Sequence, residues 1–501
     1  MKNKITEQER LIERLQSTAP QWFTCPSTGS FQLSFNGEAA LTSWSSVFTG
    51  IGGLFCTGIF ITRSSCQGHQ FLSVVSSWEI LTGSLDIVGN YGIPLVSFDK
   101  LSVVTYYLRI LNNYNLATID ISTTSLSVGE GLRVRSNIGL ETVILSRITI
   151  YPAQEASLQI SGNMGLKSVA LSHLTLWFSS NSPGLEVQNN QGPAFNLTLT
   201  QAHAYITPGA SQKQAAVVVS QNQGLHTITL GPGVNMTGDV QITSNSDLQH
   251  VVLGPSVNTT GDVQITGNPN LQHVVLGPDF YIPAEQRLFV SQNLQLRSVS
   301  FVSTVDAETV AFPGSLSVHH AVTGLSIPSF VGLGSVGGDL QLIVSASTLN
   351  GLEQIEAVGG SLTVKSSAQL VNLTGLDGLT SVAGALVIQS NANLESLTGL
   401  QALNSIGGLD ISVNPRLADL DALSGLTKIT GNVIMSGNSA FLSLEGLDQV
   451  TQIHGTLSIT LSVTQSHLDF LPNLACVTAV ASCVNCNATT VARFRSLSSC
   501  V

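Results

Sequence analysis

The chain has 501 residues, of which only 10% are charged and 43% are hydrophobic, and its formal net charge is −11. The hydrophobic share is too high for a disordered chain, and the acidic balance argues against nucleic acid as a partner. No run of about 20 apolar residues is present, so we predict no membrane span in this chain.

Residues 1–30 differ from the rest of the chain, and we predict a short amphipathic helix and an N-terminal cap there. Thr6 and Glu9 have the spacing of a capping box, and one apolar face forms around Leu11 and Leu15. No apolar core follows the basic residues, so the segment lacks the pattern of a signal peptide. This conflicts with an extracellular location, and three explanations are open: the true start differs, the chain is a fragment, or the protein is not exported by that route.

Residues 31–279 are predicted to form the N-terminal half of a solenoid of short β-strands. Apolar and polar residues alternate, and an Asn follows each strand, as in LDIVGN from Leu85. Two nearly identical lines, TGDVQIT from Thr237 and from Thr260, indicate the duplication of one coil. The spacing is irregular over residues 280–337, where we place a seam between two solenoid halves.

Residues 338–474 carry a repeat of about 24 residues, which lies in the range that marks solenoid proteins. Each repeat opens with Gly and a short strand, as in ALVIQ from Ala385, and an Asn follows at Asn391, Asn414 and Asn438. We predict that these Asn side chains point inward and bond to backbone groups, forming a ladder from coil to coil. Leu and Ile then recur at every third residue, a period that fits tight corners better than a regular helix.

This combination of leucines, strand and Asn resembles the receptor L-domain, the leucine-rich ligand-binding unit of the insulin and epidermal growth factor receptors. Related domains occur in fungal cell-wall glycoproteins. The resemblance is best from Gly338 to Ile459, and the wider leucine-rich-repeat pattern LxLxxN fits upstream. It implies an all-β fold, a right-handed parallel β-solenoid with capped ends, and a non-enzymatic role in extracellular recognition. In that family the sheet face is a ligand surface.

Three arginines mark the outer face of the early coils and are our candidate ligand-binding residues. Arg109 and Arg133 occupy the same strand position one coil apart, and Arg135 lies two residues further on, facing the same way. Like charges on adjacent strands are unfavourable without a partner, so one interpretation pairs them with Asp86 and Glu186. The other is a basic patch for an acidic ligand, because a guanidinium holds carboxylate or sulfate by two hydrogen bonds.

A carbohydrate-active β-helix enzyme, a lyase or hydrolase, would need a cluster of carboxylates in a groove. Asp239 and Asp262 take equivalent outward positions in the duplicated coils, and His250 and His273 repeat in the same way. Copied surface residues explain both pairs, and a metal between the histidines would need a third ligand that the pattern does not supply. No nucleophile elbow, P-loop or zinc-protease motif is present, so we predict no catalytic residue, metal or cofactor.

The seven cysteines lie near the two ends of the chain, where a solenoid must be sealed. We predict disulfide caps, with residues 475–501 as the C-terminal cap; a four-cysteine zinc site and reduced buried thiols are the alternatives. The odd total leaves at least one thiol unpaired within the chain. The disulfide candidates are Cys25, Cys56, Cys66, Cys476, Cys483, Cys486 and Cys500.

Five Asn-x-Thr sequons are compatible with N-glycosylation, although a chain so rich in Asn and Thr would contain about as many by chance. The glycosylation candidates are Asn196, Asn235, Asn258, Asn372 and Asn487. Ser, Thr, Asn, Gln and Gly replace most charged residues, a composition that is common on secreted and cell-wall proteins. We therefore predict an extracellular or cell-surface location.

The sequence as a whole predicts a non-enzymatic extracellular recognition or adhesion protein, similar to a receptor ectodomain or a cell-wall glycoprotein. Its partner would be a protein or glycan on the outer sheet face. The carbohydrate-active enzyme and a purely structural scaffold are the alternatives. The early coils are also rich in aromatic residues, which form either core and cap or a binding surface. These residues are Trp44, Trp78, Tyr106, Tyr107 and Tyr114.

Overall fold

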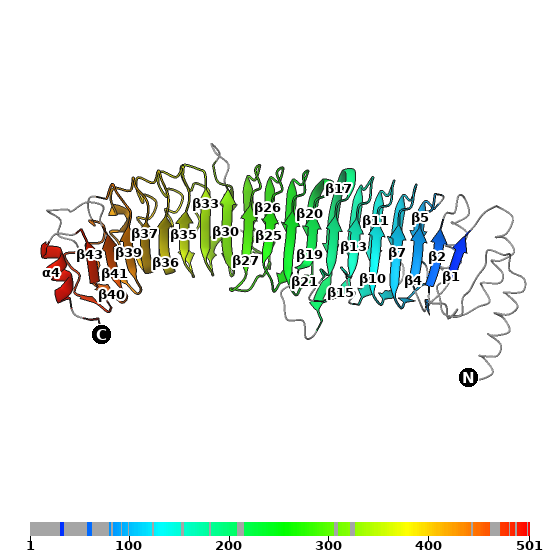
Figure 1. Ribbon diagram of the computed structural model, residues 1–501, viewed down its shortest axis with the longest axis horizontal. Coiled ribbons are helices and arrows are strands. Elements are labelled where there is room, and N and C mark those ends of the chain that lie inside the picture. The colour runs from blue at the N-terminus through cyan, green and yellow to red at the C-terminus, as the bar shows by residue number, and fades with distance from the viewer. Residues whose placement is uncertain are drawn as a thin grey trace, which may run out of the picture. The chain divides into compact units, whose positions relative to one another are not determined.

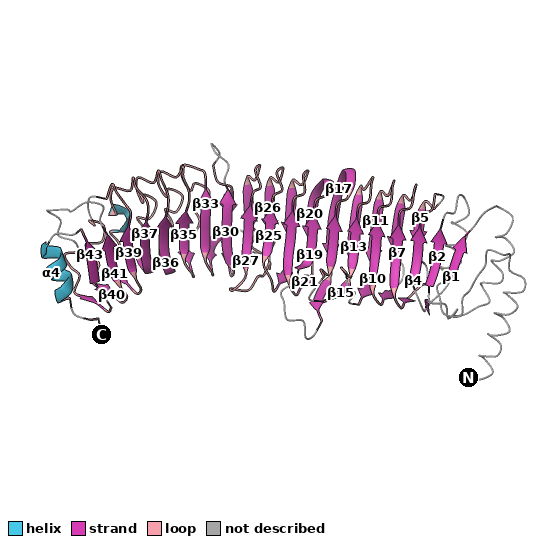
Figure 2. Ribbon diagram, viewed as in Figure 1, coloured by secondary structure: helices cyan, strands magenta, loops and turns pink. Residues whose placement is uncertain are grey.

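The computed structural model is all-β, with 3% of residues in helices, and its parallel strands stack into a β-solenoid of about 15 turns (Figures 1 and 2). The predicted fold class is thereby confirmed. The structure describes residues 31–34, 58–62, 80–81, 84–91, 93–98, 100–122, 125–151, 155–179, 182–207, 215–304, 309–320, 326–441, 444–460, 471–479, 481–485, 488–497 and 499–500. The helix predicted within residues 1–30 lies outside these residues, as do Trp44 and Trp78.

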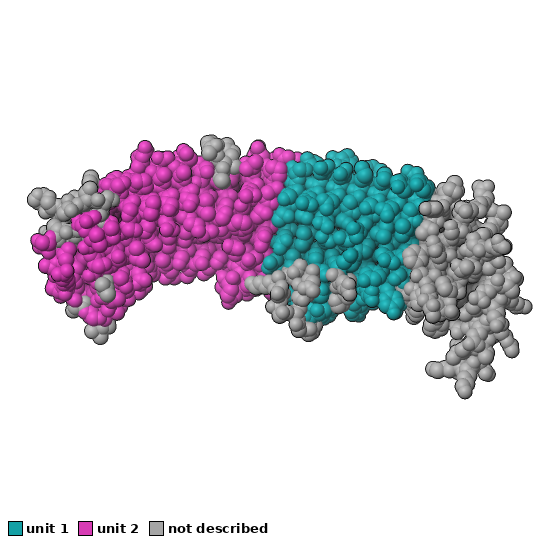
Figure 3. All heavy atoms as spheres, in the orientation of Figure 1, with its two compact units in different colours: residues 1–248 teal, residues 249–501 magenta. Residues whose placement is uncertain are grey.

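The chain divides into two compact units, Met1–Leu248 and Gln249–Val501, coloured teal and magenta in Figure 3. The domain boundaries expected from the sequence remain predictions.

Unit 1 repeats up to three parallel strands per coil, one in each of three sheets. The main sheet contains β1 (Phe31–Ser34), β2 (Gly58–Thr62), β4 (Ser84–Val88), β7 (Tyr107–Leu111), β10 (Gly131–Arg135), β13 (Leu158–Ser161), β16 (Leu185–Gln188), β19 (Ala215–Ser220) and β22 (Asp239–Thr243). The second sheet contains β5 (Leu95–Ser97), β8 (Thr118–Ile121), β11 (Thr142–Ser146), β14 (Ser168–Ser172), β17 (Gln191–Thr200) and β20 (Gln223–Leu230). The third sheet contains β3 (Ile80–Leu81), β6 (Val103–Val104), β9 (Leu126–Val128), β12 (Ile148–Ile150), β15 (Thr175–Phe178), β18 (His203–Ile206) and β21 (Val234–Met236).

Unit 2 also stacks parallel strands, which form two adjoining ladders along much of its length. The main ladder contains β25 (Val263–Thr266), β27 (Arg287–Ser291), β30 (Ser315–His320), β33 (Leu340–Val344), β35 (Leu362–Lys365), β36 (Ser381–Gln389), β37 (Ser405–Ser412), β39 (Val433–Ser436), β41 (Leu457–Thr460) and β43 (Ala481–Val484). The other begins with β29 (Val310–Phe312), β32 (Leu333–Val336) and β34 (Ala357–Val358), joins β36 and β37, and continues with β38 (Lys428–Ile429), β40 (Gln452–Ile453) and β42 (Cys476–Val477). The remaining elements are β23 (His250–Leu253), β24 (Val257–Thr259), β26 (His273–Leu276), β28 (Ser298–Phe301), β31 (Ser329–Val331), the 3-10 turn η1 (Asp421–Leu423) and helix α4 (Ala488–Ser496).

The core is built by the two-residue period of the strands. In β7, Leu108 and Ile110 are fully buried while Arg109 between them faces outward. Leu108 is opposite Leu85 on one side and Leu132 on the other, so like residues form continuous rows. Each buried aliphatic side chain contributes roughly 1.5–3 kcal/mol by leaving water. A strand too short to be stable alone is therefore stabilised by its neighbours.

The leucines at every third residue of unit 2 form consecutive turns. The N–H of Leu400 donates to the carbonyl of Leu397 at 3.2 Å, and the N–H of Leu403 donates to that of Leu400 at 3.0 Å. A hydrogen bond over three residues returns every third side chain to the same side, and all three leucines are buried. The prediction of tight corners is confirmed.

The predicted Asn ladder is also confirmed. The Nδ2 of Asn391 donates to the carbonyl of Val364 at 3.0 Å, and its Oδ1 accepts the N–H of Ser367 at 3.0 Å. Asn414 and Asn438 make the same two kinds of bond one coil further on. Equivalent buried asparagines in unit 1 are Asn90, Asn113, Asn137, Asn163, Asn190, Asn222 and Asn245.

The ladder is interrupted in two coils of unit 2, where His320 and Val344 occupy the position of the ladder Asn. The two residues are opposite each other in β30 and β33. His320 is buried, its Nε2 has no hydrogen-bond partner, and burial lowers its pKa. Ser367 then resumes the ladder, because its Oγ accepts the N–H of Val344 at 3.0 Å. The interruption begins within residues 280–337, where the repeat spacing is irregular.

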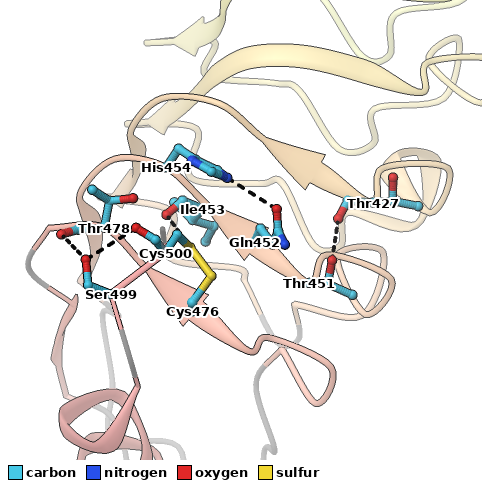
Figure 4. The surroundings of a disulfide bond; sticks show 9 residues. All are labelled: Thr427, Thr451, Gln452, Ile453, His454, Cys476, Thr478, Ser499 and Cys500. Atoms are coloured by element: carbon cyan, nitrogen blue, oxygen red, sulfur yellow. Dashed lines mark hydrogen bonds between the residues drawn. A yellow bond between two sulfur atoms is a disulfide. The ribbon is translucent and has the colours of Figure 1, made fainter.

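The C-terminal end of unit 2 is closed by a disulfide between Cys476 and Cys500 (Figure 4), whose Cα atoms are 5.0 Å apart. This bond confirms part of the predicted cap and rules out the four-cysteine zinc site. Cys483 is disulfide-bonded as well. Helix α4 packs on β43, and its Phe494 is buried. The remaining candidates, Cys25, Cys56, Cys66 and Cys486, lie outside the described residues.

Candidate functional site

The predicted arginine row exists on the outer face of the main sheet of unit 1. In register, Asp86 is opposite Arg109, Arg109 is opposite Arg133, and Arg133 is opposite Gln159. Glu186 follows Gln159 on the next strand. The sequence pattern therefore placed Arg109 and Arg133 side by side correctly, although their environments differ.

Arg109 is fully engaged by the neighbouring carboxylate. Its Nε and Nη2 donate to the two oxygens of Asp86 at 2.5 Å and 2.7 Å, and its cation lies 5.3 Å from the ring centre of Tyr107. Asp86 is only 1% exposed, whereas Arg109 is 36% exposed. Burial raises the pKa of Asp86, the guanidinium opposes that shift, and the ion pair raises the pKa of Arg109. The predicted pairing of Asp86 with an arginine is confirmed.

Arg133 is buried, with 3% of its surface exposed. Its guanidinium folds back over Gly131, where an added Cβ would lie 2.5 Å from Nη1 and where φ is +144°. Nη1 donates to the carbonyls of Leu132 at 3.3 Å and Ser157 at 3.2 Å. Nε lies 3.3 Å from a carboxylate oxygen of Glu155, while Nη2 has no hydrogen-bond partner in the described part of the chain. The pKa of Arg133 is lowered, mainly by burial.

The suggested pairing of Glu186 with an arginine is wrong. Its Oε2 accepts a hydrogen bond of 2.6 Å from the Nε2 of Gln159, whose own Oε1 is buried and has no partner among the residues that the structure describes. Glu155 takes the role instead, from a position just ahead of β13. That position is outside the strand row, so the repeat pattern held no signal for it.

Arg135 is the exposed member of the three arginines. It ends β10, opposite Leu111 and Ser161, and no carboxylate lies within ion-pair distance of it in the described part of the chain. Within the described residues, the outer face thus combines an ion-paired guanidinium at Arg109, a buried one at Arg133 and an exposed one without an ion pair at Arg135.

A column of exposed apolar residues runs beside this face, one residue after each ladder Asn. Tyr91 and Tyr114 stack with ring centres 4.5 Å apart, and Ile138 and Met164 continue the column through backbone bridges. All four side chains are exposed. Tyr106 is exposed and Tyr107 half-buried, so the described aromatics of these coils lie largely on the surface rather than in the core. An exposed apolar column of this kind is typical of an interaction surface.

Unit 2 contains a polar hollow of about 330 Å³ on the outer face of its main ladder. It forms because Ser315 and Ser317 are short, whereas Arg287 on one neighbouring strand and Gln341 on the other are long. The lining residues are Asp262, Glu285, Arg287, Ser315, Leu316, Ser317, Asp339 and Gln341.

The hollow brings together carboxylates that are far apart in the sequence. Asp262 accepts the backbone N–H of Arg287 at 2.8 Å, and Asp339 accepts that of Ser361 at 2.7 Å. Glu285 is exposed and has neither an ion pair nor a hydrogen bond within the described residues. The repeat pattern does not reveal this group, because its members precede or begin strands in different coils.

The paired repeats offer less chemistry. His250 and His273 stack with ring centres 5.4 Å apart, and His273 bonds to Ser298 at 2.9 Å. Partial burial, then the charge of His250, lowers the pKa of His273. No group of three or more His, Cys, Asp or Glu side chains in the described ranges could hold a metal ion. Asp239 and Asp262 belong to different units.

The sequons differ in exposure. Asn196 and Asn258 are exposed, Asn235 and Asn372 are half-buried, and Asn487 lies outside the described residues. The exposed pair is the more accessible to a glycosylating enzyme.

No protein-family model and no curated protein matches this chain. The receptor L-domain resemblance therefore stays an interpretation of the repeat pattern. Among the helices that the structure describes, none is both long enough and apolar enough to cross a membrane.

Proposed function

We propose that this protein is a non-enzymatic recognition or adhesion protein that acts outside the cell, as a receptor-like or cell-wall component. Its ligand is an acidic glycan or protein that binds the outer face of the main sheet of unit 1, at Arg135 and the neighbouring arginines. The main support for this proposal is that the guanidinium groups of Arg109, Arg133 and Arg135 differ in how completely their donors are bonded. Among the described residues, Arg135 is exposed and has no ion partner, and Arg133 is incompletely bonded, in a chain with only 19 basic residues.

Three further features support this proposal. A rigid stack of parallel strands offers a long surface on which ligand contacts repeat at one strand spacing. The exposed column from Tyr91 to Met164 lies on the same coils as the arginines. The disulfide between Cys476 and Cys500 is compatible with an oxidising, extracellular environment.

Arg135→Ala is expected to elute from a heparin column at a lower salt concentration than the wild type. The exposed guanidinium can hold sulfate or carboxylate, and salt screens such contacts over about 8 Å at physiological ionic strength. The matched control is Arg495→Ala, which removes an exposed arginine from α4 and should change elution less. If the wild type is not retained at low salt, or if both variants elute alike, the outer face of unit 1 is not an anion-binding surface.

A carbohydrate-active enzyme is the second candidate, because the hollow of unit 2 gathers the carboxylates that such chemistry needs. In that case wild-type protein would release reducing ends from a polysaccharide. Glu285→Gln would lower this rate by about 10²–10⁴-fold, as expected for loss of a general acid or base. Glu356→Gln, an exposed carboxylate outside the hollow, is the control. If the protein is a non-enzymatic recognition protein, it should release no reducing ends from neutral, amino-bearing or acidic polysaccharides. Release that Glu285→Gln abolishes would instead show that the protein is a carbohydrate-active enzyme.

A further inference from the structure

The guanidinium of Arg133 has one edge that is only half used. In Arg109, Nε and Nη2 form the edge that binds both oxygens of Asp86. In Arg133, among the described residues, the same edge has a single contact, from Nε to Glu155 at 3.3 Å, and Nη2 has no hydrogen bond. The Nε–Nη2 edge of Arg109 thus contacts two carboxylate oxygens, whereas the same edge of Arg133 contacts one.

A buried Nη2 without a hydrogen bond is unfavourable for the folded protein. A buried donor without a partner destabilises the folded protein, and more so when it is charged. The other side of the guanidinium is fixed, because Nη1 bonds to two backbone carbonyls and packs over Gly131. Arg133 is therefore held in place with its Nε–Nη2 edge on the side of Glu155.

Glu155 is a weak partner for this edge. Its side chain is 65% exposed, and its contact of 3.3 Å is longer than the roughly 2.7–2.9 Å of a good charge-assisted hydrogen bond. A contact to so exposed a carboxylate contributes little to stability. An oxyanion that used both Nε and Nη2 would bind the guanidinium better than Glu155 does.

We propose that Arg133 is an oxyanion subsite, in which a carboxylate or sulfate of an acidic glycan binds Nε and Nη2 together and displaces Glu155. Gln159, opposite Arg133 in register, has a buried Oε1 that no described residue hydrogen-bonds. An unpaired acceptor there favours a ligand with a hydroxyl near its oxyanion, as in sulfated or uronic sugars. This subsite deepens the proposed function and rests on it.

The test is calorimetric titration with a heparin hexasaccharide. Glu155→Gln removes the competing carboxylate and is expected to bind about tenfold more tightly than the wild type. Glu356→Gln removes the same charge elsewhere and should change affinity by less than about twofold. Adding Arg133→Lys to Glu155→Gln should abolish the gain, since an ammonium cannot offer two parallel N–H groups.

A second variant distinguishes the displacement of the Glu155 side chain from the loss of its charge, and it changes an exposed residue rather than a buried one. Glu155→Asp keeps the charge but shortens the side chain, and a smaller gain in affinity is expected. Tighter binding by both Glu155 variants supports the subsite, also where the wild type binds too weakly to measure. Unchanged affinity in both, while Arg135→Ala weakens binding, overturns the subsite and leaves the proposed function standing. Absence of binding by the wild type and by both Glu155 variants overturns both.

Discussion

Asn391→Ala is expected to lower the free energy of unfolding by about 2–5 kcal/mol, because it leaves two buried backbone groups without partners. These groups are the carbonyl of Val364, which accepts from Nδ2, and the N–H of Ser367, which donates to Oδ1. Alanine fills neither role, and the site is closed to water, since Asn391 is fully buried. Chemical denaturation followed by circular dichroism measures the change.

The matched control is Asn404→Ala in the following corner, where the side chain is exposed. This substitution should change stability by less than about 0.5 kcal/mol. Asn391→Ser should fall between the two, because Ser367 shows that a hydroxyl can satisfy part of the ladder. Equal unfolding midpoints for Asn391→Ala and Asn404→Ala would mean that the ladder bonds do not stabilise the coil.

Much of the fold could be predicted from the sequence because one physical rule repeats in every coil. A Leu–x–Ile strand followed by a buried Asn dictates both the inward row and the turn, so Asn391, Asn414 and Asn438 could be placed without a structure. The register of Arg109 with Arg133 followed from the same repeat. The substitution of His320 and Val344 at ladder positions was missed, because irregular spacing hides which residues share a position.

The candidate sites were harder to predict, because side chains reach across coils by amounts that the repeat does not specify. Arg133 and Arg109 hold equivalent strand positions, yet Gly131 lets the Arg133 guanidinium fold back into the protein. Its partner Glu155 lies outside the strand row, and loop length varies from coil to coil. The hollow of unit 2 likewise depends on two short serines between longer neighbours, a contrast of size rather than a motif.

Arg109→Ala is expected to destabilise the protein by about 2–4 kcal/mol at pH 7. Removing one partner of a fully buried pair typically costs about 3–5 kcal/mol, and the partial exposure of Arg109 reduces that figure. The loss arises because Asp86 would stay buried as an unpaired carboxylate. Thermal and denaturant unfolding measure it, and Arg416→Ala, which breaks an exposed pair with Glu395, should cost less than about 1 kcal/mol.

The effect of Arg109→Ala should shrink as the pH falls. Burial already raises the pKa of Asp86 above its usual value of 3.8, and loss of the guanidinium, which lowers it, raises it further. A carboxyl whose pKa is raised in the folded state is neutral in both the folded and the unfolded protein at low pH. The folded protein then loses stability as the pH rises through that pKa. The variant should therefore approach the wild type in stability near pH 4 and diverge from it toward pH 7.

Adding Asp86→Asn to Arg109→Ala completes the experiment, because it removes the buried charge itself. The double variant should recover part of the loss at pH 7 and lose the pH dependence of the single variant, which identifies direct coupling between the two side chains. A pH-independent loss in Arg109→Ala, with no recovery in the double variant, would show that Arg109 acts through packing on Tyr107 instead. In that case the packing of Arg109 on Tyr107, rather than its ion pair with Asp86, would stabilise this face. The charge of Arg109 could then bind a ligand without loss of stability.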